Sequence, residues 1–170
     1  MIYDQAAWRD YFVMVGGGAA ALTGLVFVAM SLHLGDIVNH PVHRHRARTI
    51  LAGLIAIFLR CGLVLMAGQS PRAVAVEIFG VLVVVEVILY RSIGTTHGAA
   101  DRGVILRTLA AFACLATEQL GAVALFLGAG WGLYVIVLGM LSSIVVIVTG
   151  AWLLLVGVEL PSPADQQLTT

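Results

Sequence analysis

Five stretches of this chain are predominantly apolar, and each is long enough to cross a lipid bilayer as a helix. An α-helix rises about 1.5 Å per residue, so roughly 20 residues span the ~30 Å hydrocarbon core. Uninterrupted apolar runs of this length are too long for the ~10-residue alternating strands of a membrane β-barrel. The pattern predicts an all-α integral membrane protein, a single transmembrane domain over residues 1–170 with five helices at residues 12–34, 49–68, 73–90, 105–127 and 131–158.

The composition fits a protein that is surrounded by lipid. Of the 170 residues, 61% are hydrophobic and 11% are charged, whereas about a quarter of the residues of a soluble domain are charged. All nine basic residues are arginines and nine acids balance them, so the net charge gives no reason to expect a nucleic-acid partner. Cys61 and Cys114 fall inside apolar stretches and indicate neither a disulfide framework nor a zinc site. Membrane lipids are the partners that this composition predicts.

Two short connections and the distribution of arginines predict the topology. Residues 69–72 and 127–130 leave room for tight turns only, so the second and third helices, and the fourth and fifth, should form antiparallel hairpins after a lone first helix. Positively charged loops stay in the cytoplasm, which predicts the N-terminus outside and the C-terminus in the cytoplasm. The predicted cytoplasmic side holds Arg44, Arg46, Arg48, Arg91, Arg102 and Arg107, and the other side holds Arg9 and Arg72.

Two ionisable residues, Arg60 and Glu118, lie near the middle of the second and fourth apolar stretches. A charge at that depth costs at least ~2.5 to 3.5 kcal/mol, and such groups usually face the interior of a helix bundle, in a pair or in water. We therefore expect Arg60 and Glu118 to pair. Two interpretations of the pair stay open: it fixes the register of the helices, or it belongs to a pathway for ions or protons.

The third apolar stretch holds two further acids, Glu77 and Glu86, on opposite faces of the predicted helix. Glu86 lies about one turn from the predicted cytoplasmic interface, where it could pair with Arg107. Glu77 lies near the outer end, where it could pair with Arg72. One of the two faces must look away from a simple helical core, which indicates a subunit contact or a watery cavity. Extension of the side chain to the interface is the simpler interpretation, above all for Glu77.

Small residues recur every fourth position in the first and fifth apolar stretches. In lipid, apolar side chains gain little by meeting each other, so grooves of small residues promote helix association through close van der Waals contact. Such grooves either pack helices within one subunit or join subunits into a dimer or a larger assembly. The residues concerned are Gly16, Gly17, Ala20, Ala21 and Gly24 in the first stretch, and Gly139 and Ser143 in the fifth.

The first stretch also carries a pattern made of Phe12, Gly16, Gly17, the run 19–25, Phe27, Val28, Ala29 and Ser31. This pattern resembles the first helix of an uncharacterised group of small bacterial multi-pass membrane proteins. The resemblance covers about one of the five predicted helices. The group has no assigned activity, so the resemblance implies a location in the bacterial plasma (inner) membrane and no catalytic residue.

Three histidines, His40, His43 and His45, are clustered between the first and second stretches. Imidazole binds zinc, copper and nickel, which makes the three histidines candidate metal ligands. Arg44 and Arg46 lie between and beside them and oppose a bound cation. The other interpretations are a basic loop that contacts anionic lipid headgroups and a loop that responds to pH.

The sequence contains none of the common enzyme or nucleotide-binding motifs: GxSxG, HExxH, the P-loop and the dinucleotide fingerprint are all missing. No apolar stretch has a histidine in its interior that would hold haem. We therefore expect a non-enzymatic protein without a cofactor. The leading hypothesis is a homo-oligomer that forms a channel- or transporter-like polar pathway for ions or small solutes, lined by Arg60 and Glu118, with Glu86 as a further candidate. The alternatives are an accessory subunit that docks another membrane protein, and a cytoplasmic-face sensor of metal or pH built on the histidines.

Overall fold

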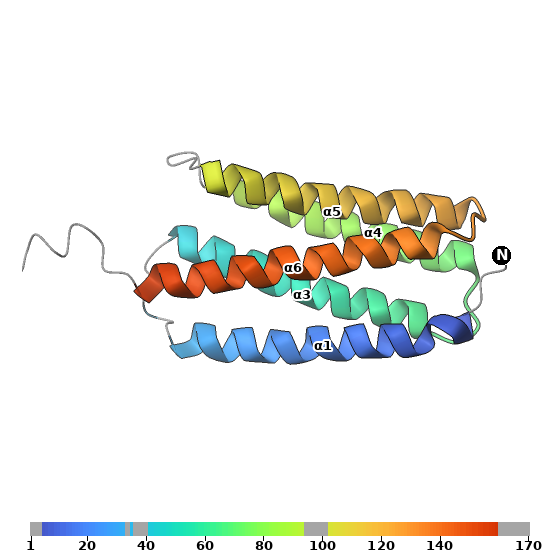
Figure 1. Ribbon diagram of the computed structural model, residues 1–170, viewed down its shortest axis with the longest axis horizontal. Helices are drawn as coiled ribbons and strands as arrows, with labels where there is room; N and C mark the ends of the chain where they lie inside the picture. The colour runs from blue at the N-terminus through green and yellow to red at the C-terminus, as the bar shows by residue number, and fades with distance from the viewer. Residues whose placement is uncertain (1–4, 33–34, 36–40, 94–101, 160–170) are drawn as a thin grey trace, which may run out of the picture.

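The computed structural model describes residues 5–32, 35, 41–93 and 102–159, and the described residues form a bundle of long helices (Figure 1). The helices are α1 (Gln5–Leu32), α3 (Pro41–Leu65), α4 (Pro71–Ile93), α5 (Arg102–Phe126) and α6 (Gly132–Glu159). Each is long and apolar enough to cross a membrane. The predicted all-helical class and the five candidate spans are therefore confirmed for the described part of the chain, and they are compatible with a membrane protein.

Helices α1 and α3 begin earlier than the apolar runs within them. Helix α1 begins at Gln5 rather than at residue 12, and α3 begins at Pro41 rather than at residue 49. Proline suits the first position of a helix because its missing N–H would have no partner there and its φ angle is already helical. The apolar pattern marks only the apolar part of a helix, so a more polar extension such as residues 41–48 is not recognised by it.

Short turns with glycine caps join α3 to α4 and α5 to α6. Gly68 and Gly128 have positive φ angles of 77° and 83°, a conformation that glycine adopts without steric cost. After α5, the Ala129 amide donates to the Ala124 carbonyl at 2.9 Å and the Gly128 amide donates to the Leu125 carbonyl at 3.0 Å, the paired bonds of a Schellman cap. At the start of α4, Ser70 Oγ accepts a bond from the Ala73 amide at 3.2 Å.

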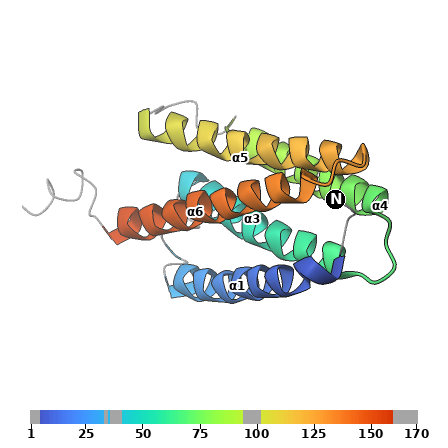
Figure 2. The same ribbon diagram turned by 45° about the vertical axis from the view of Figure 1, so that its right-hand side comes forward.

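The two ends of the bundle differ in how closely the helices approach. We call the end with the two turns the hairpin end and the opposite end, where Arg46, Arg91 and Arg107 lie, the arginine end. Helices α5 and α6 converge toward the hairpin end and diverge toward the arginine end in both views (Figures 1 and 2). A larger apolar core fills the hairpin half, and a smaller one joins α1, α3 and α6 at the arginine end. The larger core includes Phe12, Val64, Val74, Leu125 and Leu133, and the smaller one includes Met30, Ile50, Leu54 and Leu154.

Glycine sets the close approach of α5 and α6. A Cβ atom on Gly121 would lie 2.7 Å from the Ile136 nitrogen, and one on Gly132 would lie 2.6 Å from the Leu125 nitrogen. These neighbours are backbone atoms, so no side-chain rotation could relieve the contact. Backbones that pass at this distance gain the van der Waals contact that holds helices together in lipid.

Candidate functional site

The centre of the bundle holds an ion pair between Arg60 of α3 and Glu118 of α5. Arg60 Nη1 donates to Glu118 Oε2, and the two residues are only 2% and 0% exposed. Arg60 Nε also donates to the Ala56 carbonyl at 3.0 Å. Ser143 of α6 donates to the other carboxylate oxygen, Glu118 Oε1, at 2.9 Å. The pairing expected from the sequence is present, and it ties three helices together.

Helix α6 comes close to the ion pair because Gly139 faces Glu118. A Cβ atom on Gly139 would overlap Glu118 Cγ and would lie 3.1 Å from the Cys114 carbonyl oxygen. The small residues predicted on the fifth stretch, Gly139 and Ser143, therefore pack within the subunit, where Ser143 also serves as a hydrogen-bond donor. The sequence pattern indicated the groove but not which helix fills it.

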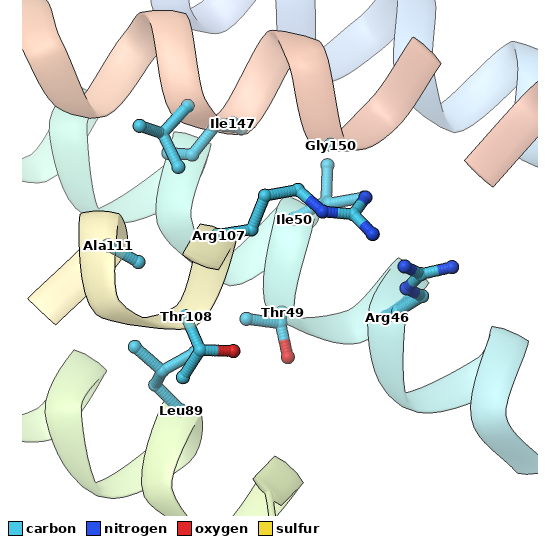
Figure 3. Close-up of a pocket in the computed structure, with 10 residues that line it drawn as sticks. Arg46, Thr49, Ile50, Leu89, Arg107, Thr108, Ala111, Ile147 and Gly150 are labelled. Carbon is cyan, nitrogen blue, oxygen red and sulfur yellow. The ribbon is translucent and has the colours of Figure 1, made fainter. Parts of the chain in front are cut away.

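A cavity leads from the arginine end toward the ion pair. Its outer part has a volume of about 150 Å³ and lies between α3, α4, α5 and α6, with Arg46 and Arg107 among its lining residues (Figure 3). An inner part of about 70 Å³ reaches Arg60 and Ser143. The two parts adjoin, since both are lined by Thr49, Leu89, Ala111, Val146 and Ile147.

Two arginines at the outer part of the cavity were not predicted to lie together. In Figure 3 the Arg107 side chain extends along the cavity toward the side where Arg46 lies. Arg107 Nε donates to the Gly103 carbonyl at 3.2 Å, and both arginines are half-buried. Among the described residues, no carboxylate forms an ion pair with either guanidinium. The apolar pattern did not reveal that α3 begins at Pro41. This early start places Arg46 on a helix rather than in a loop.

The acids of the third stretch have other surroundings than those expected. Glu77 accepts two bonds from Gln69 Nε2, at 2.9 and 3.0 Å, whereas Arg72 is exposed. Glu86 is half-buried, and the described structure contains no ion pair between it and Arg107. The turn brings Gln69 back over the first turns of α4, a local contact that helix periodicity does not reveal.

The groove of small residues on α1 is split between two environments. Gly16 is buried, and a Cβ atom there would lie 3.0 Å from Cys61 Cβ of α3. The other four residues of the predicted groove, Gly17, Ala20, Ala21 and Gly24, are exposed on the outer surface of this chain. The face of α1 that packs in the bundle carries Phe12, Val15 and Ala19 beside Gly16.

The histidine cluster lies partly on α3. His43 and His45 are half-buried residues of that helix, and two residues of spacing turn their side chains to different faces. His40 lies outside the described residues. Within the described residues, no group of three or more His, Cys, Asp or Glu side chains is placed to hold a metal ion.

Comparison of the chain with protein-family models, with curated proteins and with solved structures finds no match.

Proposed function

We propose that the protein is a non-enzymatic membrane protein that provides a polar pathway, of the channel or transporter kind, for ions or small solutes. The observation that carries this proposal is the cavity whose walls run from Arg46 and Arg107 to Arg60. A buried charge in a membrane protein usually faces a partner or a water-filled path, and Arg60 has its partner Glu118 and the inner part of the cavity beside it. The hairpin half, filled by the larger apolar core, would close the pathway on the opposite side.

The proposal includes the placement of the chain in the membrane. With the arginine end in the cytoplasm, as the positive-inside rule requires, the cavity would open inward and the N-terminus would lie outside. We place the protein in a bacterial plasma membrane as a homo-oligomer. The exposed small residues on α1, among them Gly17, Ala21 and Gly24, support a helix contact with a second copy, because lipid-facing small residues allow close approach.

A second candidate function is that of an accessory subunit for another membrane protein. The same exposed face of α1 favours it, since a different protein could occupy that face. The ion pair would then serve only to fix the register of α3, α5 and α6, and the complete hydrogen bonding of Glu118 by Arg60 and Ser143 suits that role.

Flux through reconstituted liposomes tests the pathway. The probes are potassium, chloride, protons and glycerol, each measured over a range of pH and, for the ions, of membrane potential. Ala111 lines both parts of the cavity, so Ala111→Phe should block it and lower the flux at least tenfold. Ala113, two residues further along α5, is exposed, so Ala113→Phe is the matched control and should conduct like the wild type.

The ion pair is tested separately by Arg60→Met combined with Glu118→Leu. This double variant removes both charges and leaves neither partner buried alone, so the protein should still fold. The pathway hypothesis predicts altered flux or selectivity in the double variant. A wild-type protein that passes none of the probes, or an Ala111→Phe variant that conducts normally, would refute the pathway and leave the accessory function.

A further inference from the structure

The outer part of the cavity brings two like charges together, and no acid of the described part of the chain lines it. Arg46 comes from α3 and Arg107 from α5, and both line the same space. The ten residues that line it include no Asp or Glu, and no described carboxylate pairs with either arginine. Two half-buried guanidinium groups repel each other across such a space, and an anion between them turns the repulsion into two attractions.

We propose that Arg46 and Arg107 together bind a phosphate group at the outer part of this cavity. The guanidinium group is planar, always charged and suited to bidentate bonds with phosphate oxygens. Arg107 uses Nε for the Gly103 carbonyl, which leaves its two terminal nitrogens as donors. The outer volume of about 150 Å³ is roughly ten times the minimum that holds one water molecule, so a phosphate group fits.

The walls beneath the arginines suit an apolar body attached to that phosphate. Six of the ten lining residues are nonpolar: Ile50, Leu89, Ala111, Val146, Ile147 and Gly150. Thr49 adds little to anion binding, because its hydroxyl donates to the His45 carbonyl at 2.9 Å. Charge at the outer part and hydrocarbon below is the arrangement of basic pockets between membrane helices that bind lipid headgroups. The ligand would occupy the outer part of the cavity that we propose as the pathway, but its binding is measured separately from solute flux.

The phosphate could belong to a lipid or be free in solution, and ligand comparison separates the two sources. The purified protein in a mild detergent is titrated with dioctanoyl phosphatidic acid, with dioctanoylglycerol and with inorganic phosphate. Binding is followed by the shift in Tm and by native mass measurement. Phosphatidic acid should bind at least tenfold more tightly than dioctanoylglycerol, which has the same chains without phosphate. Inorganic phosphate binding as tightly as phosphatidic acid would keep the anion site and assign it to free phosphate.

Substitutions locate the site. Arg46→Gln and Arg107→Gln should each weaken phosphatidic acid binding at least tenfold. Arg48→Gln is the matched control, because Arg48 lies two residues from Arg46 on the same helix and is exposed; its affinity should stay within twofold of the wild type. Arg46→Lys and Arg107→Lys retain the charge and lose the bidentate geometry, so they should bind with intermediate affinity. These two lysine variants decide the question if a glutamine variant does not fold.

The proposal is overturned if dioctanoylglycerol binds as tightly as phosphatidic acid, because the apolar walls alone would then explain binding. It is also overturned if Arg48→Gln weakens binding as much as Arg46→Gln does, since the effect would then come from the general charge of the arginine end. The proposal is likewise overturned if folded variants of Arg46 and Arg107 bind phosphatidic acid as tightly as the wild type does.

Discussion

At the hairpin end, α5 and α6 approach so closely that only glycine fits at positions 121 and 132, whereas at the arginine end the same two helices border a cavity. Apolar residues supply most of both ends. The difference lies in how near the backbones come, because lipid is as apolar as a leucine side chain and gives little reward for burying one. At the hairpin end, Gly121 and Gly132 therefore allow the close approach of α5 and α6.

The ion pair of Arg60 and Glu118 lies between these two ends and gives the largest expected effect on stability. Glu118→Leu leaves Arg60 buried without its partner, so the free energy of unfolding should fall by about 3 to 5 kcal/mol. The double variant with Arg60→Met should recover most of that loss. Reversible unfolding in mixed detergent micelles measures both variants. If the single variant is as stable as the wild type, the pair does not hold the two ends together.

A pair of glycines on α6 compares the two ends directly with a smaller expected effect. Gly132→Ala places a Cβ against the backbone of α5 at the hairpin end, so we expect a loss of about 1 to 3 kcal/mol from overpacking. Gly150 borders the cavity and has nothing within 4 Å of an added Cβ. Gly150→Ala should be neutral or stabilise by up to about 1 kcal/mol, because alanine favours the helix. Equal losses at both positions would contradict the difference in packing that we describe.

Two tryptophans provide the smallest contrast. Trp8 packs against Tyr134 near the hairpin end, with ring centroids 4.8 Å apart and an interplanar angle of 80°. An aromatic pair of this kind contributes about 0.5 to 1.5 kcal/mol beyond the area it buries, so Trp8→Leu should destabilise the protein by about that amount. Trp152, on α6 toward the arginine end, is 68% exposed, and Trp152→Leu should change the stability by less than about 0.5 kcal/mol. Thermal unfolding of the two variants under identical detergent conditions decides the comparison.

The helices and the central ion pair could be predicted because placing a polar or charged group in hydrocarbon without a partner costs free energy. A polar group in the middle of a span is costly, so the apolar runs mark the spans and Arg60 points to Glu118. Lipid and the bundle interior have the same polarity, so periodicity alone cannot tell a lipid-facing stripe from a packed one. The pattern therefore groups Gly16 with Ala20 and Gly24, although Gly16 is buried against α3 and the other two residues are exposed.

The cavity with its two arginines could not be predicted for a different reason. Arg46 lies before the second apolar stretch and Arg107 lies at the start of the fourth, where the apolar pattern does not fix which face of the helix a side chain occupies. That both arginines line one cavity depends on the early start of α3 and on the divergence of α5 from α6. Ser143 was recognised as a small residue, but its bond to Glu118 depends on the register that the turn at Gly128 imposes.

The ion pair between Arg60 of α3 and Glu118 of α5 also has a consequence for the synthesis and membrane insertion of the chain. Glu118 follows Arg60 by 58 residues, and a ribosome that adds about 5 to 20 residues per second needs roughly 3 to 12 s to reach it. During that interval the arginine lacks Glu118, the partner that it has in the folded protein. A mid-span charge without its partner is costly in hydrocarbon, so we expect the helix that carries it to stay near water until its acidic partner has been synthesised. Biogenesis would then deliver the two hairpins together rather than in succession.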